Sequence, residues 1–383
     1  MKITKLFKNF VESEKSAGLL LIFCTVLSIG LSNSYFGQDF IDFWHISLAG
    51  NSIEYYLNDG LMTIFFLMIG LELERELYGG ELSNFKDALL PIFGAIGGMI
   101  FPAAVFLYFN YGTVAQSGAG IPIATDIAFA LGILSLIGSK VPLSLKVLLT
   151  ALAVIDDLGA ILIIAIFYTN TIAWSQLVIA FAIFAALLVL NRLKVRNLFP
   201  YLIGGFIMWY FMANSGVHAT ITGVLLAFAI PFGNGDDKST SYILQEFLHN
   251  PVAFFILPLF AFCNSAIVFT DSILTSLAEN YSLGIGLGLL IGKPLGIFAA
   301  IFFAVSLKIC TLPADVNWKS ILGISLLGGI GFTMSIFITL LAFDDDKIIN
   351  TSKLMIFLAS VIAGIIGFLV LKISLSTKHV EVL

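Results

Sequence analysis

Apolar residues in this chain come in runs of roughly 20 residues, separated by short polar or turn-forming segments. Runs of that length match the hydrocarbon core of a bilayer, where a helix satisfies its own backbone hydrogen bonds. Hydropathy, read with turn and charge breaks, predicts about twelve transmembrane helices, centred in 17–33, 57–78, 90–109, 117–137, 146–168, 175–191, 198–212, 216–231, 250–269, 283–305, 320–342 and 353–373. The seventh and eighth are short enough to form one re-entrant pair instead.

Composition supports a membrane protein. Hydrophobic residues make up 59% of the chain and charged residues 11%, against about 25% charged residues in a typical soluble domain. With so few charges the chain cannot cover itself with a water-soluble surface, so membrane lipid is its expected surroundings. The net charge of -5, with basic residues scattered singly, excludes a nucleic-acid surface. We expect an all-α polytopic protein with one integral membrane domain over 1–383.

The distribution of basic residues predicts the orientation. An even number of helices places both chain ends on one side of the membrane. If that side is the cytoplasm, almost all loop lysines and arginines lie inside, and the outer segments hold only Lys347 and Lys353. This excess of positive charge predicts a multi-pass protein of the bacterial cytoplasmic (inner) membrane, with cytoplasmic N- and C-termini.

One of the longest connections between helices has the pattern of a β-hairpin. Within residues 43–55, a Gly50-Asn51 pair separates two short alternating segments, which is typical of a two-residue hairpin turn. The topology places this hairpin on the outer face. Because an exposed strand edge can pair with its own copy, the segment predicts a homodimer.

Four ionisable residues fall near the centres of predicted helices. Asp126 lies in the fourth helix, Asp156 and Asp157 in the fifth, and Lys293 in the tenth. Each such group at the bilayer centre costs at least about 2.5 kcal/mol on insertion scales. Buried ion pairs that only hold helices together would not explain them, because three acids and one base leave carboxylates in excess.

A carboxylate at that depth can hold a proton or exchange it for a hard cation, since burial disfavours its charged form and oxygen ligands suit such cations. Asp156 and Asp157 differ by about 100 degrees around a helix, so both cannot point equally at one spot. One is expected to take the ion and the other a different partner. Lys293 is the obvious partner, and its displacement on ion binding would release a proton.

Two predicted helices contain helix-breaking sequence at this depth. The fourth has Gly-Ala-Gly-Ile-Pro over 118–122, and the eleventh has Gly-Gly-Ile-Gly-Phe-Thr over 328–333. Half-helix ends carry partial charges, which Asp126 could neutralise at N-termini and Lys293 at C-termini. The breaks fall in the middle helix of helices three to five and of helices ten to twelve. Matching interruptions of this kind indicate inverted-topology repeats. Such repeats occur in several families of secondary transporters, including the family that this chain resembles.

The chain resembles the NhaA family of bacterial Na+/H+ antiporters over nearly its whole length. No single motif is decisive, but their joint order and spacing are highly specific. The residues that carry the resemblance are Phe65–Glu72, Ala95–Met99, Pro122–Ala130, Ala153–Ala160, Ser215–Thr220, Leu257–Phe262, Gly292–Gly296 and Gly331–Ile336.

The resemblance implies twelve helices with two interrupted, crossing helices in a core bundle of helices three to five and ten to twelve, the remaining helices lying on the dimerisation side. It also implies electrogenic exchange of external protons for internal Na+ or Li+, without a cofactor. In that picture Asp157 is the principal ion- and proton-binding carboxylate, and Asp156 beside it pairs with Lys293, so Na+ would bind at Asp157 and Asp156. Asp126 and Thr125 match residues at the helix crossing, where Asp126 balances the helix dipoles and could ligate the ion through water.

A regulatory role is implied for several other residues. Glu72 and Glu76 match acidic residues of the family's pH-sensing funnel, although a solvated helix end would explain them equally well. The other wall of the funnel departs from the family pattern: its Leu-Glu-His reads Leu244-Gln245-Glu246, and His249 is not followed directly by proline. The sensor is therefore expected to be retuned or shifted to Glu246 and His249. His218, within the predicted eighth helix, suits a packing role or a pH-modulating role.

Two other functional classes compete with an ion-coupled antiporter. An intramembrane aspartyl protease, an enzyme, needs one aspartate on each of two helices sharing a proton, which a tandem Asp156-Asp157 with Lys293 does not match. A sodium symporter of an organic anion would need a further basic residue at the midplane, and Lys293 is alone there.

Overall fold

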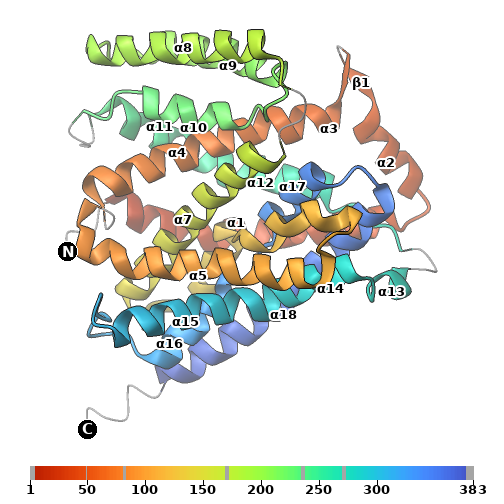
Figure 1. Cartoon of the computed structure of the whole chain (residues 1–383), viewed down its shortest axis with the longest axis vertical. Coiled ribbons are helices and arrows are strands. Elements are labelled where there is room, and N and C mark those ends of the chain that lie inside the picture. Colours follow the sequence, from red (N-terminus) through yellow and green to blue (C-terminus); the bar gives the residue numbers. More distant parts are fainter. Residues whose placement is uncertain are drawn as a thin grey trace.

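The computed structural model describes residues 5–48, 50–80, 83–168, 172–233, 238–269 and 273–376, so the two chain ends lie outside it. These residues form a bundle of helices with one short hairpin (Figure 1). In chain order the elements are α1 (Lys5–Ser32), α2 (Gly37–His45), β1 (Ser47–Leu48), β2 (Asn51–Ser52), α3 (Ile53–Tyr55), η1 (Tyr56–Leu61), α4 (Met62–Gly79), α5 (Phe85–Asn110), η3 (Val114–Ile123), α6 (Ile127–Leu136), η4 (Gly138–Lys140), α7 (Leu143–Phe167), α8 (Trp174–Arg192), α9 (Phe199–Ala213), α10 (Ile221–Ala229), α11 (Thr240–Pro251), η5 (Val252–Ile256), α12 (Leu257–Asn264), α13 (Ile273–Ser276), α14 (Asn280–Leu287), η6 (Gly288–Gly292), α15 (Lys293–Ser306), α16 (Trp318–Gly328), α17 (Phe332–Ala342) and α18 (Asp346–Ser376).

Most predicted spans coincide with a long apolar helix. Within the described residues, eight helical stretches are long and apolar enough to cross a membrane, and two bent pairs would make ten. The bent pairs are Ser16–Ser32 with Gly37–His45, at 112°, and Trp318–Gly328 with Phe332–Ala342, at 41°. The predicted seventh and eighth spans are the 15-residue α9 and the nine-residue α10. The all-α polytopic class is confirmed, and the count of twelve crossings stays a prediction.

The last helix begins earlier than hydropathy predicts. α18 starts at Asp346, whereas hydropathy places its beginning at 353. The first two turns are rich in polar residues, which lower the mean hydropathy but do not prevent a helix. An acidic side chain such as Asp346 is favourable in a first turn because it faces the positive end of the helix dipole. Lys353, predicted in an outer connecting segment, therefore lies inside α18.

The hairpin within 43–55 has a different turn from the predicted one. β1 and β2 pair antiparallel, with Leu48 opposite Asn51. Asn51 therefore lies in β2 and not in the turn, which contradicts the predicted Gly50-Asn51 turn, and residue 49 lies outside the described residues. Gly50 has a φ of 98°, a conformation that glycine adopts without steric cost. Pairing of this hairpin with a second copy stays a prediction.

The packing of α5 against α15 depends on two glycines. A Cβ atom on Gly97 would collide with the carbonyl oxygen of Gly296, and a Cβ on Gly296 would collide with that of Gly97. Small residues at such a point let two backbones approach closely within a membrane. α15 therefore lies directly along α5 (Figure 1), which fixes the helix that begins with Lys293.

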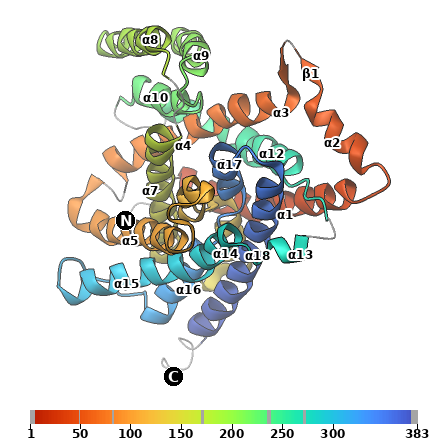
Figure 2. The same cartoon turned by 45° about the vertical axis from the view of Figure 1, so that its right-hand side comes forward.

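The two interrupted stretches lie against each other near the centre of the bundle, where α17 is seen beside α12 and α18 (Figure 2). Between η3 and α6 the chain is extended over residues 124–126, and α16 and α17 are separated by residues 329–331. The Asp126 N–H donates to the Ile330 carbonyl at 2.7 Å, and the Ser335 hydroxyl donates to the Ile121 carbonyl at 2.7 Å. Each break thus satisfies backbone groups of the other, as buried irregular backbone requires. Helix crossing in the family's sense and the inverted repeat stay predictions.

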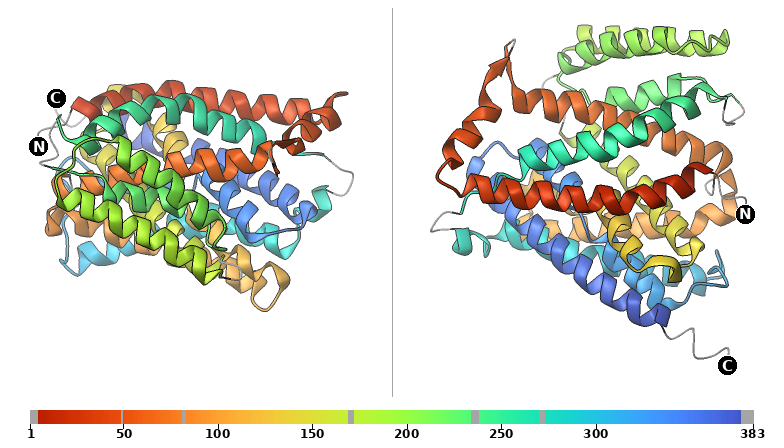
Figure 3. Two further views of the ribbon diagram at one scale, coloured as in Figure 1. Left: turned by 90° about the horizontal axis from the view of Figure 1, so that it is seen from above. Right: turned by 180° about the vertical axis from the view of Figure 1, so that it is seen from behind.

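The described ends of the chain lie on one side of the molecule. The first turn of α1 and the last turn of α18 point the same way, whereas α2, the hairpin and α13 lie at the opposite side (Figure 3). The predicted orientation would make the side with the hairpin the outer face.

Candidate functional site

Asp126 holds the two half-helices together. It is the residue before α6, and its Oδ1 accepts from the Phe129 N–H at 2.9 Å, as an N-cap does. Its Oδ2 accepts from the Thr333 N–H at 3.0 Å and from the Thr333 hydroxyl. Because Thr333 is the second residue of α17, one buried carboxylate faces the N-termini of both half-helices, where negative charge is favourable.

Asp156 and Lys293 form a fully buried ion pair. Lys293 Nζ lies 2.9 Å from Asp156 Oδ2, and both side chains are 0% exposed. The same ammonium donates to the carbonyl of Ile123, the last residue of η3. The Thr125 hydroxyl lies 2.9 Å from Asp156 Oδ2 and 3.0 Å from the Gly328 carbonyl at the end of α16. The Lys293 ammonium and the Thr125 hydroxyl therefore interact with backbone carbonyls at the C-terminal ends of both interrupted stretches, where positive charge is favourable.

Asp157 has no comparable partners. It is 1% exposed, and both of its carboxylate oxygens lack a hydrogen bond among the described residues. Oδ1 of Asp156 also lacks one. Asp157 interacts electrostatically with Asp156, Lys293, Asp126 and Glu72. A buried polar atom without a partner costs free energy, so these three oxygens mark a place where a proton or a cation would stabilise the protein.

The backbone that carries Lys293 is also irregular. α14 continues through the π-helical turn η6 directly into α15, whose first residue is Lys293. Single π turns within a helix occur frequently at functional sites because they re-aim the side chains that follow. Nothing in hydropathy signals this turn.

Comparison with known proteins places the chain in a family. The model described as Na+/H+ antiporter 1 matches residues 8–371. A Na(+)/H(+) antiporter NhaA of Flavobacterium psychrophilum is 70% identical over 381 residues, covering 100% of this chain and 99% of that protein. A protein of the same name from Cytophaga hutchinsonii is 60% identical, covering 98% of this chain and 97% of that protein. Another from Dechloromonas aromatica is 58% identical, covering 96% of each chain.

The chain belongs to the Na+/H+ antiporter 1 family. The resemblance found in the motifs is thereby confirmed, and so is the multi-pass membrane class.

In the acidic segment of α4, Glu72 and Glu74 are buried and Glu76 is partly buried. Glu72 is 3% exposed, and its Oε1 lies 3.8 Å from an Arg75 nitrogen. Glu76 Oε1 lies 3.7 Å from the same nitrogen. Glu74, which the sequence does not single out, is also buried, with Oε2 lacking a hydrogen bond among the described residues. Of the four charged residues that act electrostatically on Asp157, Glu72 acts most weakly.

The remaining pH-sensing candidates lie in different surroundings. His249 on α11 interacts electrostatically with Arg75 of α4, and α11 packs on α4. Glu246, one turn earlier, is exposed.

His218 precedes α10 and does not lie deep in a helix, which corrects the prediction. Its Nε2 lies 3.0 Å from the carbonyl oxygen of Tyr168, the residue that follows α7. Tyr168 follows Asp157 by 11 residues, which correspond to about 16 Å of helix. Gly216, with a φ of 84°, turns the chain before α10 and explains why the helix starts later than hydropathy predicts.

Three buried phenylalanines were not anticipated as functional. The ring centroids of Phe66 and Phe337 are 5.6 Å apart, and those of Phe260 and Phe337 are 6.2 Å apart. We refer to these three residues as the phenylalanine barrier. Aromatic residues are so frequent in this chain, with 36 phenylalanines, that composition could not distinguish these three from lipid-facing ones.

Proposed function

We propose that the protein is a secondary transporter of the bacterial inner membrane that extrudes Na+ or Li+ in exchange for external protons. The observation that carries the proposal is the carboxylate of Asp157, which has no hydrogen bond among the described residues and is buried beside the Asp156–Lys293 ion pair. The relative from Flavobacterium psychrophilum, which is named a Na(+)/H(+) antiporter and is 70% identical over the whole chain, agrees with it.

Ion binding and proton release are coupled through shared oxygens. Na+ prefers oxygen ligands, and the free oxygens of Asp157 and Asp156 supply them. A cation there competes with Lys293 for the Asp156 carboxylate, and it displaces the proton that Asp157 holds when the site is empty. The ammonium that loses its partner in a buried place also tends to give up its proton. Two groups that release protons for one bound cation would make the exchange electrogenic.

The surrounding residues organise this site. Asp126 keeps the two half-helix N-termini in register, and Thr125 orients Asp156 while it remains able to reach a bound ion. Because Na+ and protons compete for one site that is loaded from either side, their fluxes are coupled without ATP or a redox cofactor. Glu72, Glu76, Glu246, His249 and His218 stay candidates for pH regulation, with Glu72 supported best by its link to Asp157.

The function is tested by a pH-gradient assay in everted membrane vesicles. Addition of Na+ or Li+ to vesicles that have been acidified inside should collapse the gradient, and K+ serves as the comparison ion. No response to Na+ or Li+ between about pH 6 and 9, with the protein present in the membrane, would refute the proposal. A response that needed an added organic anion would instead favour the symporter.

A further inference from the structure

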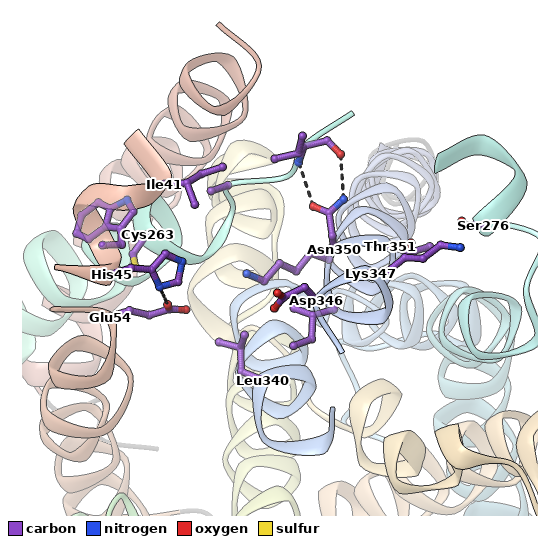
Figure 4. Close-up of a pocket in the computed structure, with 15 residues that line it drawn as sticks. Ile41, His45, Glu54, Cys263, Ser276, Leu340, Asp346, Lys347, Asn350 and Thr351 are labelled. Carbon is purple, nitrogen blue, oxygen red and sulfur yellow. Dashed lines mark hydrogen bonds and ion pairs between the residues drawn. The ribbon is translucent and has the colours of Figure 1, made fainter. Parts of the chain in front are cut away.

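A cavity of about 570 Å³ is lined by His45 and Glu54, which flank the hairpin, and so it opens on the side of the molecule that carries the hairpin. Its walls come from α2, α3, α12, α13, α17 and the first two turns of α18 (Figure 4). His45 and Glu54 face each other on one wall, with Nδ1 and Oε2 3.5 Å apart. On another wall, the Asn350 side chain binds both backbone groups of Val268, at 3.0 and 2.9 Å, and so fixes the connection after α12. We call this space the outer cavity.

The outer cavity ends one helical turn above the phenylalanine barrier. Cys263 lines the cavity, and Phe260 lies three residues before it on α12. Leu340 lines the cavity, and Phe337 lies three residues before it on α17. Residues three apart share a helix face. Thr333, which binds Asp126, lies four residues before Phe337 on α17, so along this helix Phe337 lies between the outer cavity and Asp126.

Lys353 is the unusual residue of the outer cavity. It is 9% exposed, lines the cavity, and makes no hydrogen bond or close ion pair with any described residue. Glu54 and Asp346 interact with its charge electrostatically from farther away. An ammonium group has three donors and is costly to bury without acceptors. Water within the outer cavity must therefore solvate Lys353, which makes the cavity a hydrated vestibule.

The charges that face this vestibule nearly cancel. Glu54 and Asp346 contribute two carboxylates, and Lys347 and Lys353 contribute two ammonium groups, while His45 pairs with Glu54. Lys347 and Asp346 are both exposed, so solvent and salt screen their charges. Lys353 is enclosed, so its charge acts on the vestibule more strongly. Without Lys353 the vestibule would carry a net negative charge and would attract cations.

We propose that Lys353 keeps the affinity of the outer vestibule for Na+ low, so that released Na+ leaves and external Na+ does not return to the midplane site. The inference rests on the proposed antiport and adds an asymmetry between the two faces. One enclosed charge at several ångströms in hydrated surroundings changes local cation occupancy roughly three- to tenfold.

The test measures inhibition from the outer face alone. In everted vesicles the outer face lines the lumen, so lumenal Na+ is loaded at graded concentrations and the initial rate is measured with Na+ added to the bath. Lys353→Gln should be inhibited at a roughly three- to tenfold lower lumenal Na+ concentration. Its apparent KM for bath Na+ should not change. Lys353→Arg should behave as the parent protein does.

Two further variants separate charge from structure. The double variant Glu54→Gln with Lys353→Gln restores the balance of charge and should restore the parent lumenal inhibition. Lys347→Gln removes the same charge at the screened rim and should shift inhibition less than Lys353→Gln does. Asp346→Asn should shift it in the opposite direction, which keeps a test available if Lys353→Gln does not fold.

Three outcomes would overturn the proposal: unchanged lumenal inhibition in Lys353→Gln, an equal change at both faces, or failure of the double variant to restore inhibition. These outcomes differ from failure of the proposed function itself. In that case the parent protein would show no Na+-dependent exchange from either face.

Discussion

Asp126 and Asp157 are the same residue type, and each is 1% exposed, yet their surroundings are opposite. Asp126 accepts hydrogen bonds from Phe129 and Thr333, so both of its oxygens are satisfied. Asp157 has no hydrogen bond among the described residues. A carboxylate whose oxygens are filled by the protein organises the protein. One whose oxygens are left free is available to a ligand.

The difference has an energetic basis. A hydrogen bond to a charged group contributes about 1.5–3 kcal/mol, whereas a buried group left without partners carries its full desolvation cost. We therefore expect substitution of Asp126 to lower the stability of the protein and substitution of Asp157 to impair transport. Four experiments bear on it, from the largest expected effect to the smallest.

Asp157→Asn should reduce Na+-dependent collapse of the pH gradient to background, because an amide neither carries the proton nor neutralises the cation. The side chain loses no hydrogen bond, so the melting temperature in detergent should stay near that of the parent protein. Transport is measured in everted vesicles, with the amount of inserted protein checked by immunoblotting. Full activity in this variant would refute the assignment of Asp157 as the ion site.

Asp126→Ala should destabilise the protein by about 3–5 kcal/mol. It removes the hydrogen bonds from Phe129 and Thr333, and it removes the negative charge that faces both half-helix N-termini. Thermal unfolding in detergent measures the effect. Asp126→Asn is the matched control, because it keeps the shape and one acceptor oxygen. If the melting temperature of Asp126→Ala were close to that of Asp157→Asn, the predicted difference between the two aspartates would be refuted.

Na+ should stabilise the parent protein by about 2.7 kcal/mol when its concentration is 100 times the dissociation constant. The stabilisation should be absent in Asp157→Asn and present in Asp126→Asn. Because protons occupy the same oxygens, the Na+ concentration needed should rise as pH falls, by at most about tenfold per pH unit for each competing proton. If Na+ stabilised Asp157→Asn as much as the parent protein, the ion would bind at a site other than Asp157.

Thr125→Val should have the smallest effect, a loss of about 1–2 kcal/mol in stability, because Asp156 Oδ2 keeps its ion pair with Lys293 when the hydroxyl is removed. Apparent Na+ affinity should weaken moderately while exchange persists. Thr125→Ser retains the hydroxyl and serves as the control. Complete loss of transport in Thr125→Val, with Thr125→Ser active, would show that the hydroxyl is an obligatory ligand of the ion.

Element boundaries show where hydropathy falls short. It located every long apolar helix, because a bilayer-spanning helix must be apolar over a fixed length. It misplaced the start of α18, where polar residues continue a helix, and it put His218 inside a helix that begins only at Ile221. It also could not indicate the π turn before Lys293, since that turn changes the hydrogen-bonding pattern without changing the composition.

The sequence by itself determined the membrane class and the two helix breaks, because each follows from the kind and order of residues along one helix. It could not decide which carboxylate is satisfied and which is free. That depends on donors from residues about 30 to 210 positions away, such as Thr125 for Asp156 and Thr333 for Asp126. Nor could it show that Lys353 is enclosed in a vestibule, since six separate helices meet there only in the folded chain.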